Sequence, residues 1–140
     1  MSVIIDASVA LKWVLDEPGA EAALALQNEE LIAPALWLVE VANALWRRTS
    51  RGELTEAEAL ERLAALADAP VTSTAIELDL LAAAKLANDL RHPVYDCLYL
   101  AAAIRENTYV MTADRRFYAV ASGSPDHASA VQLLEVQISA

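Results

Sequence analysis

The chain has 140 residues, of which 56% are hydrophobic, with only 3 Gly and 5 Pro and a formal net charge of −10. This length fits one domain over residues 1–140, and the apolar content excludes a disordered chain and favours a helix-rich globular protein. No apolar run approaches the roughly 20 residues of a membrane span and the start lacks the basic region of a signal peptide, so we expect a cytoplasmic protein without a membrane contact.

Short apolar stretches alternate with helical patterns along the chain. In chain order they predict strand 3–5, helix 8–15, helix 20–28, strand 31–33, helix 34–51, helix 55–67, strand 71–74, helix 76–90, helix 95–106, strand 108–112, helix 115–121 and strand 131–136. Ser8 is expected to cap the first helix, Pro34 to start the long one, and Thr55 with Glu58 to form a capping box. This alternation predicts an α/β fold, a three-layer sandwich in which helices flank a short central parallel sheet.

Four carboxylates stand in apolar surroundings where an unpaired charge is costly to desolvate: Asp6, Glu40, Asp96 and Asp114. Asp6 and Asp114 each follow an expected strand, and the carboxyl ends of parallel strands meet at one edge of a sheet. The helix that begins near Asp96 must run antiparallel to the strand after it, which returns Asp96 to that edge. Glu40 lies in the second turn of the long helix and stays near it. We therefore expect all four side chains to converge.

Each acid alone has an ordinary structural explanation as a helix cap, a first-turn acid or a solvated carboxylate. Together they need a counter-ion, because two carboxylates about 4 Å apart repel by roughly 4 kcal/mol at an effective dielectric near 20. An all-oxygen ligand set favours Mg²⁺ or Mn²⁺ as the cofactor, and whether one ion or two is bound stays open. A structural zinc site is excluded, because the chain has one Cys and two separated His. Cys97 is expected to be a buried thiol.

Basic and polar side chains surround these acids in the sequence. Asn43 and Arg47 share the helix face of Glu40 by their i, i+3 and i+7 spacing. Two clusters could contact phosphate groups, namely Arg47, Arg48 and Arg51 in the first and Arg115 and Arg116 in the second. Placement at a solvated helix end explains them equally well. The net charge of −10 argues against a polyanionic partner, but bound cations and this clustering weaken the objection.

Four segments in this order and spacing resemble the PIN-domain ribonucleases, most closely the VapC-type toxins of bacterial toxin–antitoxin pairs. They are IIDASVALKW at 4–13, PALWLVEVANAL at 34–45, YDCLYLAAAI at 95–104 and VMTADRRF at 110–117. The resemblance implies that the four acids form a catalytic, metal-binding quartet, with Ser8 and Thr112 as supporting hydroxyls. It also implies Mg²⁺- or Mn²⁺-dependent hydrolysis of RNA phosphodiester bonds.

A toxin of this type would have protein partners as well as an RNA substrate. The apolar helix around Trp37, Leu45 and Trp46 is mostly core by its composition, and part of it could bind another chain. We expect a homodimer that also binds a small antitoxin, whose C-terminal segment brings a basic side chain toward the acids.

Other functions remain to be weighed. A phosphatase with an aspartyl nucleophile would need an Asp two residues after Asp6, where Ser8 stands, and a receiver domain would need an acidic pair by the first strand and a late Lys. Both are rejected. The alternatives left open are a non-catalytic PIN-like module that binds RNA or protein and a housekeeping RNA-processing nuclease.

Overall fold

The structure is a computed structural model that describes residues 2–135, and it contains one five-stranded sheet with the strand order β3-β2-β1-β4-β5. Each neighbouring pair of strands is parallel. The strands are β1 (Ser2–Ile5), β2 (Glu30–Pro34), β3 (Val71–Thr74), β4 (Val110–Thr112) and β5 (Val131–Leu133). The predicted central parallel sheet is therefore present.

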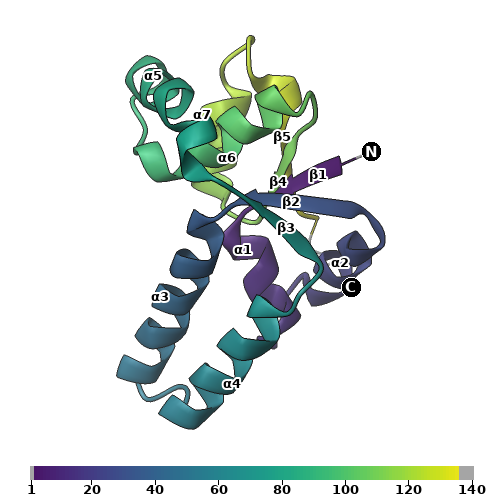
Figure 1. Cartoon of the computed structure of the whole chain (residues 1–140), viewed down its shortest axis with the longest axis vertical. Helices are drawn as coiled ribbons and strands as arrows, with labels where there is room; N and C mark the ends of the chain where they lie inside the picture. The colour runs from purple at the N-terminus through teal and green to yellow at the C-terminus, as the bar shows by residue number, and fades with distance from the viewer. Residues whose placement is uncertain (1, 136–140) are drawn as a thin grey trace.

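Helices cover both sides of this sheet, as the sequence pattern predicted. They are α1 (Ala7–Ala10), α2 (Ala20–Ala25), α3 (Leu36–Ser50), α4 (Glu56–Ala67), α5 (Leu80–Leu90), α6 (Val94–Arg105) and α7 (Arg115–Ser122). Figure 1 shows α5, α6 and α7 on one side of the sheet and α1 and α2 on the other, with α3 and α4 paired and projecting away from it. The expected α/β three-layer fold is confirmed.

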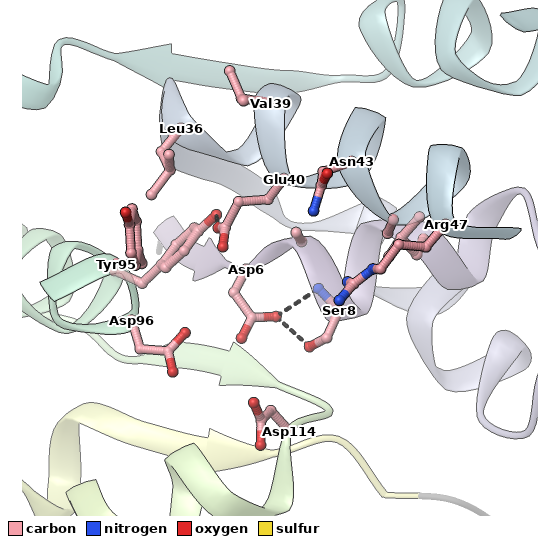
Figure 2. Close-up of a pocket in the computed structure, with 14 residues that line it drawn as sticks. Asp6, Ser8, Leu36, Val39, Glu40, Asn43, Arg47, Tyr95, Asp96 and Asp114 are labelled. Atoms are coloured by element: carbon pink, nitrogen blue, oxygen red, sulfur yellow. Dashed lines mark hydrogen bonds between the residues drawn. The ribbon is translucent and has the colours of Figure 1, made fainter. Parts of the chain in front are cut away.

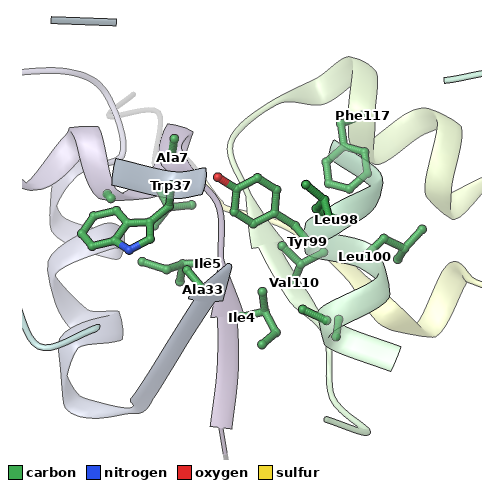
Figure 3. Close-up of a cluster of buried hydrophobic side chains, with 14 of the residues drawn as sticks. Ile4, Ile5, Ala7, Ala33, Trp37, Leu98, Tyr99, Leu100, Val110 and Phe117 are labelled. Atoms are coloured by element: carbon green, nitrogen blue, oxygen red, sulfur yellow. The ribbon is translucent and has the colours of Figure 1, made fainter. Parts of the chain in front are cut away.

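The core lies where β1 and α6 meet at the centre of the molecule (Figure 3). Ile4 and Ile5 of β1 are completely buried, as is Tyr99 of α6. The following residues 101–103 of α6 are three buried alanines, whose small side chains let the helix lie close to the strands. A helix that is apolar on all sides is typical of such a central position.

The strand order reverses between β1 and β4. From β1 the chain builds outward through β2 and β3, and then returns to add β4 on the other side of β1. The carboxyl ends of β1 and β4 are consequently neighbours, with Ile5 paired to Met111. A switch of this kind leaves a crevice at the carboxyl edge of the sheet, which is where ligands bind in open α/β folds.

Three boundaries in the first half of the chain were predicted wrongly. Asp6, not Ser8, caps α1, because the Asp6 side chain accepts a hydrogen bond from the backbone N–H of Ser8 at 3.0 Å. That helix ends at Ala10 and continues only as a 3₁₀ turn, Leu11–Trp13. Pro34 belongs to β2 rather than to the long helix, since sheet pairing continues past it through the 2.8 Å bond from the Ala35 N–H to the Thr74 carbonyl.

The second half holds one break that the periodicity did not predict. The expected helix 76–90 is a 3₁₀ turn, Ile76–Leu78, followed by α5. Asp79 separates the two parts, because its buried carboxylate turns toward Arg105 and accepts a bond from Nε at 2.7 Å. The capping box of Thr55 and Glu58 at the start of α4 is confirmed.

Two predicted strands are shorter than expected. The strand expected at 108–112 covers only Val110–Thr112, because Asn107 takes a left-handed conformation and the Thr108 hydroxyl bonds to the Ser2 carbonyl at 2.6 Å. The strand expected at 131–136 ends at Leu133, and its last position lies outside the described residues.

No helix within residues 2–135 is long and apolar enough to cross a membrane.

Candidate active site

A pocket of about 450 Å³ opens at the carboxyl edge of β1 and β4 (Figure 2). The four acids singled out from the sequence all line it: Asp6 after β1, Glu40 on α3, Asp96 on α6 and Asp114 after β4. Figure 2 shows their carboxylates facing one another across the cavity. Four elements far apart in the sequence therefore bring like charges to one place.

Asp6 is the most deeply buried of the four, with 5% of its surface exposed. Burial, with a smaller contribution from the negative charge of Asp96, raises the pKa of its carboxyl from 3.8 to about 7, although hydrogen bonds from Ser8 and Thr112 oppose the shift. The shift means that the protein alone does not compensate the charge of Asp6. A cation bound in the pocket would supply the missing positive charge.

Two hydroxyls hold Asp6 from opposite sides. The Ser8 hydroxyl donates to Oδ1 of Asp6 and accepts from the N–H of Ala113 at 2.9 Å. The Thr112 hydroxyl donates to Oδ2 and accepts from the N–H of Asp114 at 3.0 Å. Because each hydroxyl is oriented by a backbone donor, its proton is directed to Asp6. This network joins the ends of β1 and β4, and Thr112 acts from beneath the pocket, being fully buried.

Glu40 is oriented by a residue that the sequence reasoning missed. The phenol of Tyr99 donates a hydrogen bond to Oε1 of Glu40 from the neighbouring helix α6. Burial raises the pKa of Glu40 and the Tyr99 bond opposes this, while the charge of Asp96 adds to the rise. Tyr99 lies three residues after Asp96, and this i, i+3 spacing could have indicated that both side chains reach the same pocket.

Asp96 also has a partner that was not predicted. Its Oδ2 lies 2.6 Å from Nε2 of His92, four residues earlier, which is nearly buried and stacks on the ring of Phe117 with centroids 5.7 Å apart. An ionised carboxylate can only accept, so Nε2 donates. The i, i+4 spacing of His92 and Asp96 could have indicated this positioning contact from the sequence.

Asp114 caps α7, and its Oδ1 accepts bonds from the N–H groups of Arg116 at 2.9 Å and Phe117 at 3.2 Å. The side chains of Arg115 and Arg116 are exposed in the first turn of α7 and do not line the pocket. The structure therefore does not bring these two arginines to the acids. Asn43 and Arg47 do line it, on the same face of α3 as Glu40.

The donor set fits a hard divalent cation, although the acids are not arranged as a finished metal site. Within residues 2–135, no three His, Cys, Asp or Glu side chains are grouped closely enough to hold an ion. Each acid instead bonds to its own protein partner through one or both oxygens. The second oxygens of Glu40, Asp96 and Asp114 accept no bond from residues 2–135. Oxygen ligands that are crowded, partly desolvated and still available are those that Mg²⁺ and Mn²⁺ prefer.

Comparison with known proteins agrees with this geometry. The family model for the PIN domain matches residues 3–136. The chain belongs to the PIN-domain family. PIN domains are a nuclease family and generally use divalent metals.

Solved structures add support for the fold of this PIN domain. It is similar to the crystal structure of PAE2754 from Pyrobaculum aerophilum, with a TM-score of 0.68 and 21% identity, over 89% of this chain and 82% of that one. No curated protein matches the chain. At this identity the likeness concerns the fold alone, so the roles of individual residues must be argued from the pocket.

The single cysteine of the PIN domain is a buried thiol, as expected. Cys97 is fully buried, and burial raises its pKa to about 11, which keeps it as an unreactive thiol.

Proposed function

We propose that this PIN domain is a Mg²⁺- or Mn²⁺-dependent ribonuclease that hydrolyses RNA phosphodiester bonds. The observation that carries the proposal is the convergence of Asp6, Glu40, Asp96 and Asp114 on one pocket, with the charge of Asp6 left uncompensated. These four carboxylates would hold a divalent ion, which would supply the positive charge that metal-dependent phosphodiester hydrolysis needs.

The chain's own residues have distinct tasks in this proposal. The four carboxylates bind and position the ion, and the hydroxyls of Ser8 and Thr112 keep Asp6 in one orientation. Tyr99 and His92 hold one oxygen of Glu40 and one of Asp96, so that the other oxygen of each is left to bind the ion. Preorganisation of this kind lowers the reorganisation needed when substrate arrives.

We further propose that the protein is the toxin of a type II toxin–antitoxin pair, restrained by a small antitoxin and forming a homodimer. The resemblance of the four acidic segments to VapC-type toxins supports this role. A housekeeping nuclease with the same chemistry would have no such inhibitor, so an adjacent upstream gene for a small protein with a DNA-binding N-terminus favours the toxin.

The experiment that tests the function compares RNA from cells expressing the wild-type protein with RNA from cells expressing Asp6→Asn. Sequencing of the cleaved ends should show cuts only with the wild type, and purified protein should reproduce those cuts in Mg²⁺ or Mn²⁺ but not in excess chelator. Identical RNA from the two strains would favour a non-catalytic PIN module instead.

A further inference from the structure

A second pocket of about 420 Å³ collects positive charge on this acidic protein. Lys12, Arg47, Arg48 and Arg51 line it, which is four of the ten Lys and Arg residues in the chain. Glu17 is the one carboxylate among its lining residues. We call this cavity, defined by these five residues, the basic pocket.

The basic pocket adjoins the acidic one. Ser8, Leu11, Ala44 and Arg47 line both cavities. Figure 2 shows the Arg47 side chain extending from α3 toward Ser8, beside the acids. A ligand that reaches the acids can therefore extend into the basic pocket without leaving the protein surface.

The cations differ in how strongly the protein already engages them. Glu17 lies 3.7 Å from Nζ of Lys12 and 3.4 Å from an Nη of Arg48, and Arg48 also pairs with Glu53 at 3.3 Å. Arg47 and Arg51 form no ion pair with any residue in 2–135. Glu17 thus fixes two of the cations, while the other two remain available for a ligand.

A helix dipole does not explain this arrangement by itself. Cations near the end of α3 are favoured by its C-terminal dipole, which accounts for the arginines. Lys12 comes from a different element, the 3₁₀ turn after α1, and its amine is held in place by the Pro18 carbonyl at 2.8 Å. Convergence of two elements on one cavity indicates a binding site for an anion.

We propose that the basic pocket binds backbone phosphates of the RNA strand next to the bond that is cleaved, a proposal that rests on the ribonuclease function above. A nucleic-acid strand carries a phosphate at every nucleotide, so a strand with one phosphate at the acids presents the next ones to the adjoining cavity. Arginine recognises phosphate through paired N–H donors, and Arg47 and Arg51 have theirs unused by ion pairs. Arg47, which lines both cavities, marks where the strand passes from one to the other.

Arg51 gives the cleanest test, because it lines the basic pocket and not the acidic one. Binding of a fluorescent single-stranded RNA oligonucleotide to the full chain is measured by anisotropy in excess chelator, over a range of salt concentrations. Arg51→Gln should weaken binding about fivefold and reduce the slope of log affinity against log salt by about 0.7, the contribution of one phosphate contact. Arg51→Lys, which keeps the charge but not the paired N–H donors, should restore the salt slope and only part of the affinity.

Lys85→Gln is the matched control, since it removes one positive charge from α5, where the Lys85 side chain is 76% exposed and outside both pockets. It should leave affinity and slope unchanged. Equal affinities for Arg51→Gln and the wild type, equal losses in Arg51→Gln and Lys85→Gln, or a wild type that binds no RNA would each overturn the proposal. So would a variant that keeps its RNA affinity but loses a copurifying protein, because the pocket would then be a protein site.

Cleavage in Mn²⁺ is assayed separately, so that the two proposals can fail independently. A wild type that binds RNA through Arg51 without cleaving it would refute the ribonuclease and support the basic pocket. Cleavage by a wild type whose affinity does not depend on Arg51 would refute only the basic pocket.

Discussion

The phenol of Tyr99 donates a hydrogen bond to the carboxylate of Glu40, 59 positions earlier in the chain. Tyr99 is fully buried on α6, whereas Glu40 projects from α3, so this bond links the two helices that form opposite walls of the acidic pocket. Burial raises the pKa of Tyr99, and the neighbouring Glu40 charge adds to the rise. The phenol therefore stays protonated and acts as a permanent donor.

Tyr99→Phe removes this donor and keeps the ring in the core. We expect RNase activity to fall several-fold, mainly in kcat, because Glu40 loses its orientation and the bond that favours its charged form. Stability should fall by only about 1 kcal/mol, the usual net value of one hydrogen bond. Manganese affinity from calorimetry and kcat from RNA cleavage are the measurements. Tyr109→Phe, a tyrosine outside the pocket, is the control, and equal kcat in both variants would contradict a positioning role for Tyr99.

The four acids should be individually essential. We expect each of four variants to lower metal-dependent RNase activity by at least about tenfold without unfolding the protein: Asp6→Asn, Glu40→Gln, Asp96→Asn and Asp114→Asn. Each substitution removes the negative charge of a metal ligand and keeps the shape of its side chain. Circular dichroism checks the fold, and Asp89→Asn on the exposed face of α5 is the control. Full activity in any two of the four variants, or in excess chelator, would exclude the metal mechanism.

Burial of Asp6 predicts an unusual pH dependence of stability. Its folded pKa is about 7 against 3.8 unfolded, so the folded state binds more protons between these values. The contribution of Asp6 to the free energy of unfolding should therefore be most favourable at low pH. It should fall by up to about 4 kcal/mol as the pH rises from about 4 to about 7. Urea unfolding in excess chelator at pH 5 and pH 8 measures the effect. Asp6→Asn should lose less stability across that range, and identical losses would show that Asp6 ionises normally.

Bound metal should offset the loss of stability that ionised Asp6 causes. Because the ion binds the folded state, we expect Mg²⁺ or Mn²⁺ to raise the melting temperature. The free energy of unfolding should rise by about 2.7 kcal/mol when the ion is at 100 times its dissociation constant. Without metal, Asp6→Asn should be more stable than the parent at neutral pH, since it removes one of the crowded charges. The melting temperature is measured by differential scanning fluorimetry with millimolar Mg²⁺ or Mn²⁺, and with Ca²⁺ and Na⁺ for comparison. A melting temperature that does not change with Mg²⁺ or Mn²⁺ would count against a metal-binding pocket.

The acids could be found from the sequence because a carboxylate is conspicuous in an apolar stretch and because parallel strands share a carboxyl edge. Asp6 and Asp114 could be placed at this edge without any knowledge of the neighbouring helices. Tyr99 and His92 could not be found, because their apolar rings look like core residues until the element that faces each polar tip is known. The basic pocket shows the same limit, since the spacing of Arg47 and Arg51 was visible but the approach of Lys12 from another element was not.

Long-range ion pairs set a similar limit on the fold. The helical pattern over residues 76–90 is continuous, whereas in the structure Asp79 bonds to Arg105 on α6 at the break before α5. The apolar stretch of α3 was expected to be mostly core with part of it exposed, and its burial agrees with this. Trp37 and Leu45 are buried in the core, whereas Trp46 is 62% exposed.

The toxin role predicts a stable complex with the product of the adjacent upstream gene. Trp46 and Val39 expose apolar surface on α3 beside a pocket of negative charge, and a short amphipathic segment with one arginine would suit both features. Coexpression of both genes with a tag on one should yield a complex whose RNase activity is far below that of the free protein. Trp46→Ser should weaken the complex, because it removes a large apolar contact, while leaving the activity of the free protein unchanged. Leu81→Ser on α5, 87% exposed, is the matched control. No complex, or a complex as active as the free protein, would reject the toxin role and leave the ribonuclease function standing.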